Sequence, residues 1–121
     1  GHALGDRVLI HISGLMRDTV RPYDGIGRYG GEEFLMFFPE CDEQQGRQIA
    51  ERLRNELETG PLKEQSKPLK ITASFGGTTF LPEHCRCSVT RLLKVADDAL
   101  YKAKAAGRNR VIWLPITEDE D

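Results

Sequence analysis

The chain has 121 residues, of which 39% are hydrophobic and 30% are charged, and its formal net charge is −2. This composition is ordinary for one globular domain, and the slight negative charge argues against general electrostatic attraction to nucleic acid or an anionic membrane. No apolar run is long enough to span a bilayer, and no signal-peptide pattern opens the chain. We therefore expect a single domain over residues 1–121 in a reducing cytoplasm, and a membrane anchor in the parent protein remains open.

The first half of the sequence predicts a helix, a hairpin and a second helix. Apolar residues from Leu4 to Val20 recur at helical spacing, and Pro22 ends that helix. Apolar runs at 26–29 and 34–38 flank two adjacent glycines, a pattern typical of a hairpin. Asp42 and Gln45 form a capping box for a second helix, which Gly60 and the proline after it end.

The second half predicts a strand, a helix and a closing strand. A polar loop is expected over 63–67, then an alternating strand over 69–75 that two glycines bend. A connection over 82–86 leads to a helix capped by Ser88 and ended by Gly107, followed by a strand over 111–114 and an acidic tail at 115–121. This order predicts an α/β sandwich in which helices pack on a mostly antiparallel sheet.

The three cysteines do not resemble a disulfide framework. Their number is odd, and Cys85 and Cys87 are separated by only one residue. His84 beside this pair suggests zinc, but the spacing differs from that of a zinc knuckle. Incidental loop cysteines are the favoured interpretation.

The most informative stretch is Arg28-Tyr29-Gly30-Gly31-Glu32-Glu33-Phe34. It has a plain structural interpretation, in which two glycines make a turn and two glutamates lie there because turns are exposed to solvent. It also suits a nucleotide site, because glycines let backbone approach a ligand closely and paired carboxylates offer hard oxygen ligands for Mg²⁺.

The sequence resembles the GGDEF family of diguanylate cyclases, in the GGEEF form. Residues 28–34 match the signature turn, 1–6 match a Gly-His-x-x-Gly-Asp segment, 72–76 match a strand, and 96–109 match the last helix and its cap. The resemblance covers residues 1 to about 114, in the family's order. It implies a nucleotidyl cyclase or palm-like fold, and condensation of two GTP molecules into cyclic di-GMP and pyrophosphate.

The resemblance also implies residue roles. Glu32 matches the acid that binds Mg²⁺ (or Mn²⁺) and serves as catalytic base, and Glu33 matches the acid that supports the metal site. The implied substrate contacts are Asp6 for guanine, Gly30 and Gly31 for the triphosphate, His2 as a further contact, and Lys104 with Arg108 for the phosphates. The last two are four residues apart and are expected to share a helix face. Favourable helix-end charges are the simpler interpretation of Asp6, Lys104 and Arg108.

Arg21-Pro22-Tyr23-Asp24 lies five residues before the signature glycines and matches the family's inhibitory Arg-x-x-Asp motif. The resemblance implies that Arg21 and Asp24, with Arg52 on the following helix, bind the product cyclic di-GMP and restrain the enzyme. Arginine suits this role because its planar fork bonds guanine or phosphate and stacks on a base. An ion pair beside a turn is the alternative interpretation.

The family domain normally opens with a central strand that carries an aspartate metal ligand, then a Phe-Lys-x-x-Asn-Asp segment. Neither precedes Gly1, so we expect a domain without its first strand and the start of its first helix, and both activity and inactivity of this chain on its own stay open. The resemblance further implies catalysis in a homodimer under an upstream sensory domain. Two alternatives stay open: a catalytically silent domain that senses GTP or cyclic di-GMP, and an interaction domain in which the signature is only a turn.

Overall fold

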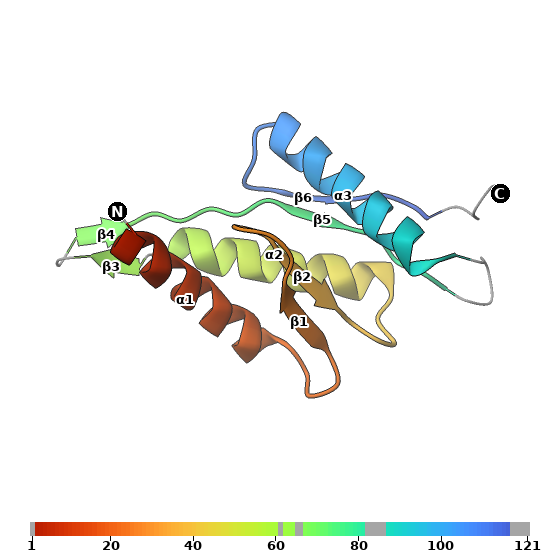
Figure 1. Ribbon diagram of the computed structural model, residues 1–121, viewed down its shortest axis with the longest axis horizontal. Coiled ribbons are helices and arrows are strands. Elements are labelled where there is room, and N and C mark those ends of the chain that lie inside the picture. Colours follow the sequence, from red (N-terminus) through yellow and green to blue (C-terminus); the bar gives the residue numbers. More distant parts are fainter. Residues whose placement is uncertain (1, 61, 65–66, 82–86, 117–121) are drawn as a thin grey trace.

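The computed structural model describes residues 2–60, 62–64, 67–81 and 87–116, although not the side chains of 2, 63 and 64. It contains three long helices, α1 (His2–Thr19), α2 (Glu43–Thr59) and α3 (Val89–Ala105). The strands form three separate pairs, drawn in Figure 1: β1 (Gly25–Arg28) with β2 (Phe34–Phe37), β3 (Leu62–Glu64) with β4 (Lys67–Leu69), and β5 (Phe75–Gly77) with β6 (Val111–Trp113). This mixed α/β architecture confirms the predicted fold class.

The helix boundaries follow the predicted signals. Asp42 accepts the backbone N–H of Gln45 at 2.8 Å, and the Gln45 side chain accepts the backbone N–H of Asp42 at 3.0 Å, which completes the capping box. Ser88 accepts the N–H of Arg91 at 3.1 Å and so caps α3. The Gly60 N–H donates to Glu56 at the end of α2.

Two predictions in the middle of the chain, a loop and a strand, were wrong. Residues 62–64 and 67–69 pair as a short antiparallel hairpin where a polar loop was expected, and residues 65–66 lie outside the described part. The strand expected over 69–75 is confined to 75–77, so Gly76 and Gly77 lie inside it. The β5–β6 pair is also parallel, in the register Gly76↔Ile112, while the other two pairs are antiparallel.

Close packing explains why glycines occupy β5. A Cβ on Gly76 would lie 2.1 Å from the backbone nitrogen of Leu100 in α3, and one on Gly77 would lie 2.3 Å from the Trp113 ring. The same ring would lie 2.7 Å from a Cβ on Gly46 in α2. The pair β5–β6 is therefore held between α3 on one side and α2 on the other, as Figure 1 shows.

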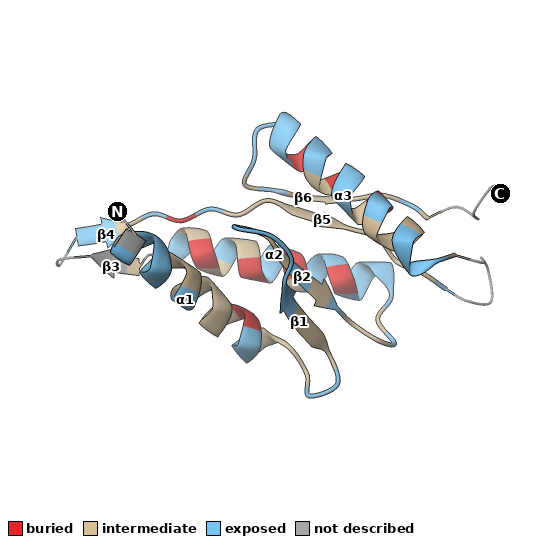
Figure 2. Cartoon of the chain, in the orientation of Figure 1, coloured by how far each residue is buried: buried red, intermediate tan, exposed pale blue. Residues whose placement is uncertain are grey.

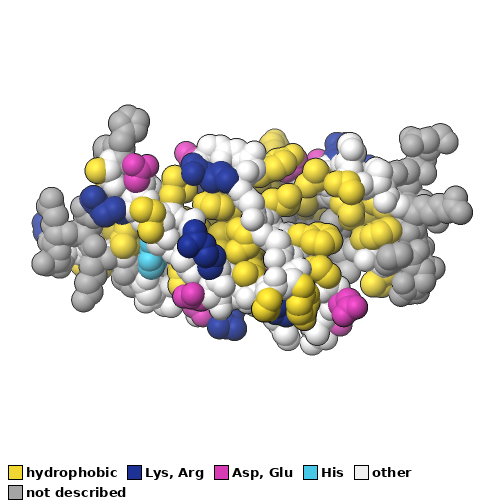
Figure 3. All heavy atoms as spheres, turned by 60° about the horizontal axis from the view of Figure 1, so that its bottom comes forward, with side chains coloured by type: hydrophobic (Ala, Val, Ile, Leu, Met, Phe, Trp, Pro, Cys, Tyr) yellow, Lys and Arg dark blue, Asp and Glu magenta, His cyan; other side chains and the backbone are white. Residues whose placement is uncertain are grey.

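The core is small and lies along the helices. Figure 2 shows the buried positions recurring along the faces of α2 and α3. The buried hydrophobic residues within the described ranges are Met16, Ala50, Leu53, Leu57, Ile71, Val95, Ala99 and Ala103. The β1–β2 hairpin contacts mainly itself, and Phe37 is 63% exposed. Figure 3 accordingly shows hydrophobic side chains gathered on the face that this view brings forward.

Candidate functional site

The signature turn is the connection between β1 and β2. Both the Tyr29 and Gly30 N–H groups donate to the carbonyl oxygen of Glu33, at 2.8 and 3.3 Å, and the Arg28 guanidinium donates to the carbonyl of Gly31. These bonds close a tight loop in which Gly30, Gly31 and Glu32 are all exposed. The backbone of Gly30 and Gly31 and the carboxylate of Glu32 are therefore accessible at the surface of the turn.

One long-range contact joins the turn to α3. The Lys104 Nζ lies 3.7 Å from Glu33 Oε2, and each side chain is about two-fifths exposed (41% and 42%). A pair this exposed contributes little to stability, but it places a cation at the carboxylates of the turn. A hollow of 350 Å³ opens beside the turn, between Tyr29 and the Thr90–Asp98 part of α3. A larger hollow of 480 Å³ at the start of α2 shares no lining residue with the turn.

Arg108 does not share a helix face with Lys104, so that expectation was wrong. The helix ends at Ala105, and Arg108 lies in the following turn with a φ of 63°. Gly107, at φ 126°, donates to Lys104, and the Arg108 N–H donates to Ala103 at 2.9 Å. These two bonds form a Schellman motif, which agrees with the helix end predicted at Gly107. The Arg108 side chain is left exposed at the same end of α3 as Lys104.

The remaining predicted substrate residues lie on α1. Asp6 is exposed in the second turn of that helix, and among the described residues no hydrogen bond or ion pair joins it to the signature turn. The His2 side chain lies outside the described residues, as do His84, Cys85 and the tail at 117–121. Within the described ranges, no three His, Cys, Asp or Glu side chains cluster closely enough to hold a metal ion.

The Arg-x-x-Asp motif forms a compact ion pair between α1 and β1. Arg21 donates from its backbone N–H to Asp24 Oδ2 at 2.7 Å and from Nη2 to Oδ1 at 2.9 Å. The Asp24 side chain is only 1% exposed, and the hydrogen bonds from Arg21 hold the pKa of its carboxyl below the usual value. Because Arg21 occupies this carboxylate, a ligand that bonds Asp24 would have to displace those bonds.

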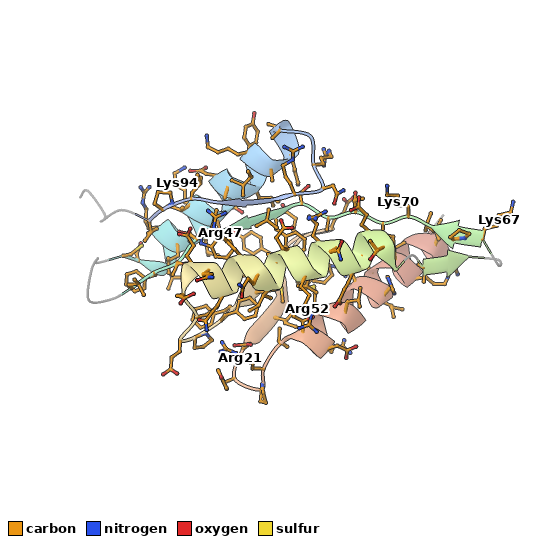
Figure 4. The ribbon with its side chains drawn as sticks, turned by 180° about the vertical axis from the view of Figure 1, so that it is seen from behind. Arg21, Arg47, Arg52, Lys67, Lys70 and Lys94 are labelled. Atoms are coloured by element: carbon orange, nitrogen blue, oxygen red, sulfur yellow. The ribbon has the colours of Figure 1, made fainter. Side chains whose placement is uncertain are left out.

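Arg21 is also oriented by two other groups. Its Nη2 donates to the carbonyl of Pro39 at 2.8 Å, and its guanidinium lies 4.6 Å from the centre of the Tyr23 ring. Figure 4 labels both Arg21, on the α1–β1 connection, and Arg52, on α2, in the lower half of the view. Arg52 pairs with Glu56 at 3.1 Å and remains 66% exposed.

Sequence reasoning missed a polar cluster that ties α2 to the turn after α3. Asn109 donates to Glu58 Oε2 at 2.6 Å, and its side-chain oxygen accepts a hydrogen bond from Arg54 Nη1 at 3.1 Å. Asn109 is more than 50 positions from both partners in the chain, so no local sequence pattern predicts the contact. The preference of asparagine for left-handed backbone was an available local signal, and Asn109 has a φ of 47°.

The arrangement resembles known proteins along almost its whole length. The family described as "Diguanylate cyclase, GGDEF domain" matches residues 1–110. Diguanylate cyclase DgcP of Pseudomonas aeruginosa is 42% identical over 111 residues, which are 92% of this chain and 16% of that protein. The chain therefore spans only a small part of this curated relative.

Solved structures agree with this result. The GGDEF domain of DgcB from Caulobacter crescentus, in complex with c-di-GMP, superposes with a TM-score of 0.84 at 34% identity, over 93% of this chain and 66% of that one. The active GGEEF domain of a diguanylate cyclase from Vibrio cholerae gives a TM-score of 0.79 at 28% identity, over 93% and 70% of the two chains. No described helix of the present chain is long and apolar enough to cross a membrane.

Proposed function

The chain belongs to the GGDEF domain family of diguanylate cyclases, and we propose that it is the catalytic domain of an enzyme that makes cyclic di-GMP from two GTP molecules. The observation that carries this proposal is the signature turn with Lys104 beside it: an exposed Glu32, and a cation 3.7 Å from the neighbouring carboxylate. The relative from Vibrio cholerae, described as an active GGEEF domain, supports activity with glutamate in the third position of the signature.

In the proposed reaction two domains face one another, each with one GTP. The ribose 3′-oxygen of each GTP attacks the α-phosphorus of the other GTP. Two new P–O bonds form, and the two bonds from the α-phosphorus atoms to the oxygens that bridge to the β-phosphates break, which releases two pyrophosphates. Glu32 accepts the proton of the attacking hydroxyl. Lys104 and Arg108 balance the charge of the leaving pyrophosphate, and Asp6 accepts hydrogen bonds from the guanine edge.

The carboxylates of the turn fit a divalent metal. Mg²⁺ is usually held by one or two carboxylates together with substrate phosphates and waters, so Glu32, supported by Glu33, is a suitable protein ligand although no larger acidic cluster is formed by the described residues. When bound, Mg²⁺ or Mn²⁺ would neutralise phosphate charge and help to activate the attacking hydroxyl.

We also propose that cyclic di-GMP binds at Arg21 and Arg52 and inhibits the enzyme. Asp24 and the Pro39 carbonyl fix the direction of Arg21 in advance, and preorganisation lowers the cost of binding. The matched test compares Arg52→Gln with Arg47→Gln, because both arginines lie on α2 and pair with a glutamate four positions away. Weaker binding of cyclic di-GMP by the first variant alone supports the site, and equal binding by both refutes it.

Product analysis tests the main proposal. The chain and the full-length natural protein are each incubated with GTP and Mg²⁺, and the products are separated by chromatography. We expect cyclic di-GMP from the full-length protein and none from its Glu32→Gln variant. If every form binds GTP or cyclic di-GMP without turnover, even with Arg21→Ala to relieve inhibition, the domain is a silent sensor instead.

A further inference from the structure

The turn that carries Arg108 is held from both sides. Gly107, Arg108 and Asn109 all have positive φ, at 126°, 63° and 47°. Two successive non-glycine residues in this region are uncommon, and such backbone persists only where surrounding contacts hold it. The Schellman bond to Ala103 holds the first side of the turn.

The second side is held by a group that we call the Asn109 clamp, formed by Arg54, Glu58 and Asn109. Asn109 donates to Glu58 at 2.6 Å and accepts from Arg54 at 3.1 Å, while Arg54 also donates to Glu58 Oε1 at 3.3 Å. The three side chains therefore form a closed triangle between α2 and the turn. All three are partly shielded from solvent, with Arg54 19% and Glu58 27% exposed.

Neighbouring charges and hydrogen bonds favour the ionised form of Glu58 in the clamp. Glu51 accepts from Arg54 at 3.1 Å, and Lys70, labelled in Figure 4, lies 3.8 Å from Glu58. The hydrogen bond from Asn109, followed by the two nearby cations, holds the pKa of the Glu58 carboxyl below its usual value. Glu58 therefore stays ionised, and accepts hydrogen bonds, through the neutral pH range.

We propose that Asn109 is a positioning residue: by clamping the turn to α2, it fixes the point from which Arg108 presents its guanidinium to the substrate phosphates. This inference rests on the proposed function, since it takes Arg108 to be a phosphate ligand. Its physical basis is that Arg108 is a long, exposed side chain, so its Cα position and backbone direction decide where its charge can reach.

The test is a double-mutant cycle on GTP binding by the full-length natural protein, measured by calorimetry with Mg²⁺ present. Asn109→Gly removes the clamp but tolerates the positive φ, so the fold is retained. We expect this variant to bind GTP about tenfold more weakly. If Asn109 acts through Arg108, the same change made in an Arg108→Ala chain causes little further loss. Glu43→Gln, which removes an exposed pair at the other end of α2, is the control and should bind normally.

A second readout does not depend on nucleotide. The Arg108 amide hydrogen is bonded to Ala103 at 2.9 Å, and its exchange with solvent should quicken by about tenfold in Asn109→Gly if the clamp holds the turn. Two outcomes would overturn the role of Asn109 but not the proposed function. One is that Asn109→Gly lowers GTP affinity equally in the wild-type and Arg108→Ala proteins. The other is that it changes neither GTP affinity nor the exchange rate of the Arg108 amide. A full-length wild-type protein that binds no GTP would overturn the proposed function, and faster exchange in Asn109→Gly would then show that the clamp holds the turn without that role.

Discussion

Replacing Gly76 with alanine tests how α3 is seated on β5. The added Cβ would lie 2.1 Å from the Leu100 nitrogen, and 2.6 Å from both the Ala96 carbonyl oxygen and the Leu100 Cα. Ordinary contact begins near 3.5 Å, so α3 would have to move away from β5 by more than about 1 Å. All three atoms belong to the helix backbone and cannot rotate aside. Overpacking typically costs about 1–3 kcal/mol, and we expect a value near the upper end of that range.

Urea denaturation followed by far-UV circular dichroism measures this loss of unfolding free energy. Gly27→Ala is the matched control, because a Cβ at Gly27 would have no neighbour within 4 Å, and its effect should stay within about 0.5 kcal/mol. Since α3 also carries Lys104, displacement of the helix should weaken GTP binding. Equal stability of the Gly76→Ala and Gly27→Ala variants would refute the close seating of α3.

Three further outcomes are expected from unfolding measurements. Gly14→Ala should raise the free energy of unfolding by about 0.5–1 kcal/mol, because Gly14 lies in the interior of α1 and the new Cβ would have nothing within 4 Å. A lower free energy of unfolding would mean that other atoms pack against position 14. Leu53→Ala, at a side chain only 1% exposed, should lower stability by about 2–5 kcal/mol, whereas Val89→Ala, at 71% exposure, should change it little; similar losses would contradict the assigned core. Side-chain hydrogen bonds lower the carboxyl pKa of Asp24 from 3.8 and that of Glu58 from 4.5 in the folded protein. The two ionised carboxylates therefore stabilise the fold fully above pH 3.8 and 4.5, and this stabilisation is lost as the pH falls through the lowered pKa values of the folded protein. Urea titrations at stepwise lower pH should show this decline, and Asp24→Asn should flatten it; an unchanged slope would reject the role of Asp24.

Local signals in the sequence predicted the helices well. The capping box at Asp42, the cap at Ser88 and the glycine after α3 each depend on groups within a few residues, so they can be recognised without knowing the fold. The strand β5 could not be located in the same way. Alternation over 69–75 pointed to a strand, but the position of β5 depends on the approach of α3 and Trp113 to its two glycines, which is a tertiary effect.

In the candidate site, too, features set by local sequence were predicted and features set by tertiary contacts were not. The turn at 29–33 was predicted from its glycines, whereas the contact between Lys104 and Glu33 was not predicted. The roles assigned to Glu32, Asp6 and Arg108 stay predictions. Arg108 was expected on a helix because counting four residues from Lys104 ignores the chain reversal that Gly107 introduces. The Asn109 clamp joins residues more than 50 positions apart, and periodicity holds no information about such pairs.

The packing of Trp113 gives the protein an internal optical reporter. The sequence contains one tryptophan, and its indole lies against Gly46 of α2 and Gly77 of β5 while its Nε1 donates to Thr79 at 3.0 Å. The Arg47 guanidinium lies 5.9 Å from the centre of the ring. Emission from this fluorophore therefore depends on three elements meeting at one point, and its intensity and wavelength will follow their separation in real time without any added dye.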